Sequence, residues 1–191
     1  MVIEKSATLR RRTPRGQGRA RLVEAAGQLF AEQGVDGTSL QSIADRLGVT
    51  KAAVYHQAAS KEEIVLAVAE PVIERLRRIA DVAELCSPAQ ARTAVIRGLV
   101  DLALVHGGAS AVLGRDPAMA HILDTHRPYR VQLERIDSLL LGPAPSAQRR
   151  IALAFAGGGI VAAGSQPGLD APVDEIRAGL IAAMTRALDT D

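Results

Sequence analysis

Four short segments with helical periodicity, separated by three tight breaks, make up residues 19–64 and constrain the fold more than any other part of the sequence. In the middle of this region, a helix predicted from Thr38 is followed by a turn at Gly48 and by a second helix that Thr50 would cap. Two short helices joined by a glycine-containing turn are typical of a helix-turn-helix. In that motif the second helix lies in the major groove of DNA.

Glycine and hydroxyl side chains mark the other ends of these helices. The first helix is expected over about residues 19–33, and Gly34 closes it. At the start of the second helix, Thr38 and Gln41 fit a capping box, in which the hydroxyl and the amide each bond a backbone N–H. Ser60 is the predicted cap of a fourth helix that continues into the rest of the chain.

Beyond residue 64 the apolar residues also recur with helical spacing, and no segment alternates as a strand would. Further helices are expected over residues 88–106, 116–125, 128–141, 147–163 and 172–188. The predicted fold is therefore all-α, with about nine helices. It divides into a flexible basic arm at residues 1–18, a three-helix helix-turn-helix head at 19–62 and a larger helical body at 63–191.

Composition narrows the class of protein. With 191 residues, 48% of them apolar, the chain can bury the core of one large domain or two small ones. It lacks an apolar run of the ~18 residues that a membrane span needs, so no membrane association is expected. The arginine-rich start has no apolar core of a secretory signal, and a single cysteine excludes an intrachain disulfide. We therefore expect a cytoplasmic location, with Cys86 as a small, half-buried core residue.

Positive charge is concentrated at the start of the chain. The overall net charge is +2, but residues 1–61 carry +5 and residues 62–191 carry −3. A basic segment that contains a helix-turn-helix favours DNA as the partner, although a basic tail can also be a solvated, disordered end. Arg15 and Arg19 are expected to contact the DNA backbone, and the arm could enter the minor groove.

The third helix should present one face to the DNA. Val49, Ala53 and Val54 are expected to point inward, which leaves Lys51, Ala52, Tyr55 and His56 facing out. An exposed tyrosine can contact a phosphate through its hydroxyl or pack on a sugar or a thymine methyl. Lys51 is a candidate for guanine or phosphate, and His56 for the backbone. The alternative is that these are ordinary surface residues of the head.

Residues 19–72 resemble the TetR family of transcriptional repressors. The resemblance rests on Ala25-Ala26, Leu29-Phe30, Gly34, Thr38-Ser39-Leu40, Ile43-Ala44, Leu47-Gly48-Val49, Val54-Tyr55 and Ser60-Lys61-Glu62. It implies a homodimer whose heads bind DNA and whose bodies bind a ligand and dimerise. In this family a small molecule in the body typically moves the fourth helix and spreads the two heads until they no longer fit the operator.

One stretch departs from the family pattern, which usually reads Tyr-x-His-Phe-x-Ser-Lys. Here Gln57 stands where histidine is usual, and Ala58 stands where a large aromatic ring usually packs. The loss of a buried aromatic ring costs ~3 kcal/mol or more unless the space is filled. Either a neighbour fills the space, or the head is less stable than usual, or the substitution was engineered.

The resemblance also assigns roles to residues outside the third helix. Thr38 and Thr50 are helix caps first, and in the family such positions also donate to phosphates, while Lys61 matches a phosphate-contact lysine. Dimerisation is expected through the last two long helices, about residues 147–163 and 172–188, where glycine and alanine permit close packing. The alternative for those two helices is an ordinary seam within one chain.

The ligand pocket is expected, by analogy with the family, among the fifth to eighth helices, with a mainly aliphatic lining that suits a mostly apolar ligand. The candidate aromatic and polar contacts are Tyr129, Phe155, His106, His121, Arg127 and Gln166. His121 and His126 are five residues apart and, with Asp124, match no standard metal site. No metal, cofactor or enzymatic activity is expected.

These patterns together predict a ligand-responsive repressor that binds double-stranded, palindromic DNA as a homodimer and is released by a small apolar effector. One alternative is a helical protein-interaction module that has lost DNA binding, with Gln57 and Ala58 as the signs of that loss. Another is an all-α enzyme or carrier that uses the C-terminal helices.

Overall fold

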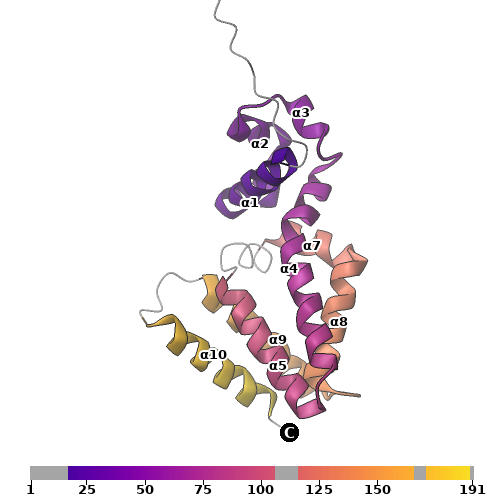
Figure 1. Cartoon of the computed structure of the whole chain (residues 1–191), viewed down its shortest axis with the longest axis vertical. Coiled ribbons are helices and arrows are strands. Elements are labelled where there is room, and N and C mark those ends of the chain that lie inside the picture. Colours follow the sequence, from indigo (N-terminus) through magenta and orange to yellow (C-terminus); the bar gives the residue numbers. More distant parts are fainter. Residues whose placement is uncertain (1–16, 106–115, 166–170, 190–191) are drawn as a thin grey trace, which may run out of the picture.

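The computed structural model describes residues 17–105, 116–165 and 171–189. Within these ranges the chain forms nine helices and no strand, which confirms the predicted all-α fold. The helices are α1 (Gln17–Gly37), α2 (Leu40–Leu47), α3 (Lys51–Tyr55), α4 (Lys61–Glu84), α5 (Pro88–Val105), α7 (Pro117–Thr125), α8 (Arg127–Leu141), α9 (Ala147–Ser165) and α10 (Val173–Leu188). Helices α1 to α3 form a head at one end of the molecule, and α4 runs from this head into the body (Figure 1).

The turn of the helix-turn-helix forms as its residues predict. Gly48 ends α2 in the left-handed conformation, with φ 65° and ψ 34°, and its N–H bonds the carbonyls of Ala44 and Asp45. Thr50 then caps α3, because its hydroxyl oxygen accepts from the N–H of Ala53 at 3.2 Å. These two caps fix the direction in which α3 leaves α2.

The predicted cap of α2 was one residue too early. Ser39 is the cap, and it forms a reciprocal box with Ser42, in which each side chain accepts from the other residue's N–H at 3.0 Å. The Thr38 side chain is instead buried, with 1% of its surface exposed, and its hydroxyl donates to the carbonyl of Gly34 at 2.8 Å. Gln41 donates to Asp45 further along the helix, so it takes no part in the cap.

Two other local expectations were also wrong. Cys86 is exposed, because it lies two residues after the end of α4, in the turn toward α5. Val49 is exposed as well, because it lies in the turn between Gly48 and Thr50 rather than on the inner face of α3. Val54 is buried as predicted, and it anchors α3 to the head.

Two hydrophobic cores share α4. The head core combines Phe30 of α1 and Ile43 of α2 with Ile64 and Val65 from the first turns of α4. The body core combines the second half of α4 with α5, α8, α9 and α10. Since α4 contributes to both cores, the expected boundary near residue 62 does not coincide with a boundary between the two cores.

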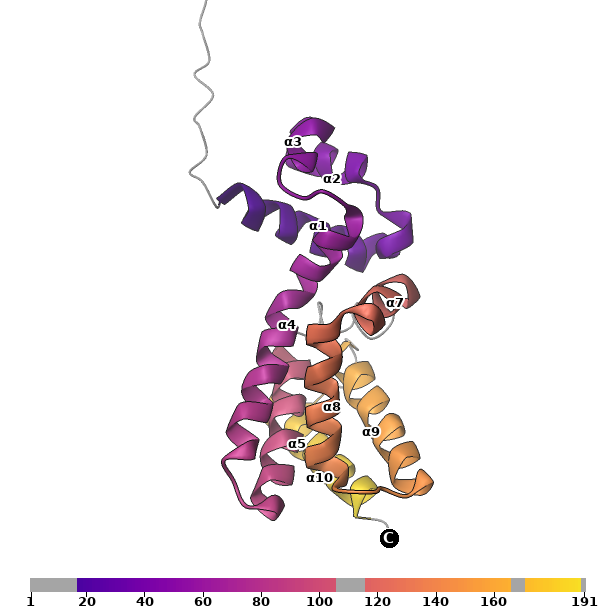
Figure 2. The same ribbon diagram turned by 90° about the vertical axis from the view of Figure 1, so that its right-hand side faces the viewer.

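The short helix α7 belongs to the body in sequence but packs into the head core. Met119 and Leu123 are fully buried against head residues, and α7 lies directly below the head beside the start of α8 (Figure 2). Asp116 caps α7, because its Oδ1 atom accepts from the N–H groups of Ala118 and Met119 at 2.9 Å. Its other oxygen accepts from the N–H of Val35, at the end of α1, at 2.7 Å.

The carbonyl of Val35 is bonded from a different helix. Lys61, the first residue of α4, donates from Nζ to the carbonyl of Val35 at 2.9 Å and to that of Thr38 at 3.3 Å. Gly34, with φ 76°, breaks the helix, so the backbone N–H and carbonyl of Val35 do not take part in the regular hydrogen-bond pattern of α1. Side chains from α4 and α7 therefore bond both polar backbone groups of one buried head residue.

The body is also tied across its surface by charged groups. Arg135 of α8 bonds Asp81 at 2.7 Å and Glu84 at 2.8 Å, both on α4. The hydrogen bonds to these two carboxylates raise the pKa of Arg135 above its usual value. In turn, the hydrogen bond from Arg135 lowers the pKa of Glu84. No helix of the described part is long and apolar enough to cross a membrane.

Replacing Asp116 with alanine tests the contact between α7 and the head. The change removes a helix cap and leaves the buried N–H of Val35 without an acceptor. We expect Asp116→Ala to lower the free energy of unfolding by about 2–4 kcal/mol, measured by urea denaturation and circular dichroism. Asp124→Ala, at an exposed position of the same helix, is the matched control and should change it by less than ~0.5 kcal/mol. Equal effects of the two changes would contradict the assigned role of Asp116.

Ala58, where an aromatic ring is usual, is only 4% exposed and lies in the head core with Val54 and Ile64. Because neighbouring side chains already enclose it, we expect Ala58→Phe to overpack the head and lower the free energy of unfolding by about 1–3 kcal/mol. Ala59→Phe, at the exposed neighbouring position, serves as the control. A higher melting temperature for Ala58→Phe than for the wild type would show an unfilled space instead.

Candidate DNA-binding surface and ligand cavity

The outward face of α3 carries the residues that the sequence pattern placed there. Lys51, Ala52, Tyr55 and His56 are all exposed, and half of the surface of Tyr55 is accessible. The helix lies at the end of the molecule away from the body, so no other described element covers this face (Figure 1). A short, exposed helix with basic, aromatic and hydrogen-bonding side chains is able to enter a DNA groove.

Two of these side chains already interact in the free protein. The ammonium group of Lys51 lies 5.9 Å from the centre of the Tyr55 ring, one helical turn away. A cation over an aromatic face gains about 0.5–1 kcal/mol at exposed sites. This pairing favours an arrangement in which the lysine charge and the tyrosine hydroxyl lie on the same surface.

Ser39 was missed by the sequence analysis, although it lies at the start of α2 on the surface of the head. Helix starts present free N–H groups and a favourable dipole to an anion such as a phosphate. Ser39 is exposed, unlike the buried Thr38 that was expected to occupy this position. The spacing from Ser39 to Ser42 is a capping-box signal that could have identified it.

The remaining predicted DNA contacts have partners within the head. The ammonium group of Lys61 donates hydrogen bonds to two carbonyls, which leaves one of its three N–H donors for a phosphate. Arg19 bonds the carbonyl of Gln57 at 2.9 Å and the carboxylate of Glu63 at 3.0 Å, although it remains half exposed. The N–H of Ala59 and the Arg19 guanidinium both lower the pKa of Glu63. Arg15 lies outside the described residues.

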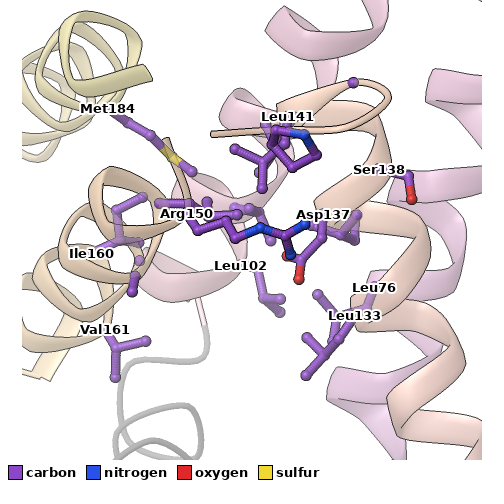
Figure 3. A pocket seen from close by; sticks show the side chains of 18 of the residues that line it. Leu76, Leu102, Leu133, Asp137, Ser138, Leu141, Arg150, Ile160, Val161 and Met184 are labelled. Atoms are coloured by element: carbon purple, nitrogen blue, oxygen red, sulfur yellow. The ribbon is translucent and has the colours of Figure 1, made fainter. Parts of the chain in front are cut away.

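The body holds a cavity of about 740 Å³ between α4, α5, α8, α9 and α10, which is open to solvent near the loop after α8. This volume is in the range of sites for small organic ligands. Its walls are mainly aliphatic and include Val72, Leu76, Leu99, Leu102, Leu133, Leu140, Leu153, Ile160 and Met184. The charged side chains in the lining are Asp137 and Arg150, which Figure 3 shows reaching toward each other from α8 and α9.

The structure places only part of the predicted ligand set at this cavity. Tyr129 lines it, and its hydroxyl has a raised pKa mainly because it is buried. Phe155 does not line it and is 82% exposed, because it lies on the opposite face of α9. His121 and Arg127 are also exposed and outside the lining. His106 and Gln166 lie outside the described residues.

Asp137 and Arg150 were not identified from the sequence. Asp137 follows Tyr129 and Leu133 at intervals of four residues, so a charged residue interrupts the apolar stripe of α8. That interruption is a signal that could have identified Asp137. Burial raises the pKa of Asp137, and the positive charge of Arg150 acts in the opposite direction.

Comparisons with known proteins agree with this arrangement. Residues 22–68 match the family model described as bacterial regulatory proteins, tetR family. The transcriptional activator FasR of Mycolicibacterium smegmatis is 37% identical over 65 residues, which cover 34% of this chain and 30% of FasR. The repressor KstR2 of Mycobacterium tuberculosis is 45% identical over 47 residues, which cover 25% of this chain and 24% of KstR2. The chain thus matches less than a third of the length of these curated relatives.

The similarity in fold extends over the body. A TetR-like transcriptional regulator from Rhodococcus sp. RHA1 superposes with a TM-score of 0.71 at 23% identity, covering 94% of this chain and 100% of that one. The prediction of a non-enzymatic protein agrees with a family of regulatory proteins. The sequence match identifies residues 22–68 as a DNA-binding domain of the type found in bacterial regulatory proteins of the tetR family, and head and body together share the fold of TetR-like regulators.

Proposed function

We propose that the protein is a homodimeric repressor that binds a pseudo-palindromic operator and is released by a mostly apolar small molecule. The observation that carries this proposal is the exposed face of α3, with Lys51 and Tyr55 paired on it. A two-fold dimer presents two such helices, and its DNA site should therefore be two-fold symmetric. The face is polar and basic, which supports DNA over a protein partner.

The proposed dimer interface is the outer surface of α9 and α10. Ile151 and Phe155 of α9 are 69% and 82% exposed, and Val173 of α10 is also exposed. At Gly158 and Gly159, which are exposed, an added Cβ would meet no atom within 4 Å, so a second backbone could approach closely. Leu153 and Ile160 of α9 pack into the body core of the same chain, which leaves the opposite face free for a second subunit.

The cavity is the proposed effector site, because α4 links it to the head. Val72 and Leu76 of α4 line the cavity, while Ile64 and Val65 of the same helix belong to the head core. A ligand that shifts the lower half of α4 would therefore change the position of the head. The relatives include both an activator and a repressor, and release of DNA on effector binding is the behaviour that we propose here.

Substitutions on α3 test DNA recognition. We expect Tyr55→Ala and Lys51→Ala each to weaken operator binding by about 1–3 kcal/mol while the oligomeric state stays the same. The operator is first selected from random DNA with the wild-type protein. Fluorescence anisotropy then measures the affinity of each variant for it. Gln28→Ala, at an exposed position of α1, is the control.

Salt dependence gives a second measure of the same proposal. If each head makes ~4 phosphate contacts, a dimer makes ~8, and the log–log slope of affinity against salt should be about −7. Unchanged affinity of both α3 variants would contradict the chosen face. Absence of salt-dependent binding to any duplex would favour the protein-interaction module instead.

A charge at the centre of the proposed interface should separate the subunits. We expect Phe155→Glu to be a folded monomer under conditions in which the wild type is a dimer, because a carboxylate cannot be buried there without a partner. Size-exclusion chromatography with light scattering measures the mass. Val82→Glu, at an exposed apolar position of α4, is the matched control and should remain dimeric. A dimeric Phe155→Glu variant with wild-type stability would place the interface elsewhere.

A further inference from the structure

One pair of opposite charges interrupts the apolar lining of the cavity. Asp137 comes from α8 and Arg150 from the first turn of α9, and their side chains reach across the space between the two helices (Figure 3). Within the described ranges, neither side chain makes a hydrogen bond or an ion pair with another residue. Their charges interact through space, as the effect of Arg150 on Asp137 shows. Both therefore keep hydrogen-bonding capacity for a bound molecule.

The charged pair lies at one end of an elongated apolar space. Tyr129, Leu133, Asp137 and Leu141 follow one another at four-residue intervals on α8, and all four line the cavity. Eight residues of helix separate Tyr129 from Asp137, which corresponds to about 12 Å along the axis. Arg150 and Asp137 are both on the solvent-accessible side, beside the loop of residues 142–145. A ligand that fits this shape has one polar end and an apolar body.

The chemistry of the pair favours an anionic polar end. A guanidinium presents parallel N–H donors that match the two oxygens of a carboxylate. While Asp137 is ionised, its carboxylate would repel the carboxylate of the ligand. Once protonated, Asp137 donates a hydrogen bond to the ligand carboxylate. Although Asp137 is partly open to solvent, partial desolvation by the cavity wall raises its pKa, a direction that favours holding this proton. The set of the Arg150 guanidinium, the ligand carboxylate and a protonated Asp137 has no net charge.

We propose that the cavity binds an amphipathic monocarboxylate, whose carboxylate contacts Arg150 and Asp137 and whose apolar chain extends toward Tyr129. This inference deepens the effector role proposed above and rests on it. A primary alcohol of the same length could accept one hydrogen bond from Arg150 but would lose the ionic contact through two oxygens. An amine would place a second positive charge beside the guanidinium.

Matched ligands of one chain length test the proposal. Decanoate and decylamine, each below its critical micelle concentration, and decanol, below its solubility limit, are titrated into the full-length wild-type protein and followed by isothermal titration calorimetry. We expect decanoate to bind at least tenfold more tightly than decanol, and decylamine to bind weakest, because hydrogen bonds to charged groups contribute about 1.5–3 kcal/mol. Affinity for decanoate should fall as the pH rises through the pKa of Asp137, since the bound state holds one more proton.

Variants assign the effect to the two residues. Arg150→Gln should weaken decanoate binding about tenfold or more and leave decanol binding unchanged. Asp137→Asn, which imitates the protonated side chain, should retain decanoate binding and remove its pH dependence. Arg127→Gln, at an exposed position of α8 outside the cavity, is the control. Leu133→Trp places an indole ring between Tyr129 and Asp137, in the path of the chain, and should weaken binding of decanoate and decanol alike.

The possible failures are distinguishable. Equal binding of decanol and decanoate, with no effect of Arg150→Gln, overturns the assignment of the polar end but leaves an apolar effector site. An affinity for decanoate that Leu133→Trp leaves unchanged places the ligand elsewhere and also overturns the proposal. If no probe binds, the carboxylate assignment and the apolar effector site both fail, while operator binding by the same preparation still tests the DNA-binding role separately.

Discussion

The position of the head depends on how one buried residue, Val35, is bonded. Its N–H is held by Asp116 of α7 and its carbonyl by Lys61 of α4, at 2.7 and 2.9 Å. These groups lie at the break of α1, where the N–H has only the Asp116 carboxylate as its acceptor, while the carbonyl also accepts from the N–H of Thr38 at 3.2 Å. A buried N–H without an acceptor is costly, so the contact with Asp116 must be kept when the head takes this position, and Lys61 adds a charged donor to the carbonyl. The head and the body are thereby connected through the turn at the end of α1, which lies outside both the exposed face of α3 and the lining of the cavity.

The role of Lys61 shows how tertiary contacts change the meaning of a charge. A positive residue in the first turn of α4 is unfavourable with respect to the dipole of that helix. Its ammonium, however, reaches the carbonyls at the end of α1, which is the negative end of another helix dipole. The same side chain therefore stabilises the junction of head and linker helix. A contact of Lys61 with phosphate is limited to the donor that remains.

The two cores and the cavity are connected by α4 and α8. Helix α4 contributes to the head core, the body core and the cavity wall, and Tyr129 at the start of α8 packs against both cores. Protein interiors are densely packed, so a change in the occupancy of the cavity displaces neighbouring side chains rather than being absorbed. This continuity is the physical basis on which we propose that a ligand in the body changes the spacing of the heads in a dimer.

Local signals in the sequence determined the helices, the turn at Gly48, the cap at Thr50 and the outward face of α3, because caps and periodicity act over a few residues. They did not decide between Thr38 and Ser39 as the cap of α2, since both side chains are able to cap and only burial of Thr38 in the head excludes it. Asp137 and Arg150 meet only because α8 and α9 pack across one cavity. The bonds to Val35 likewise join residues far apart in the chain. Side-chain pairs of this kind depend on how the helices pack in three dimensions. The spacing of residues along a single helix holds no information about that packing.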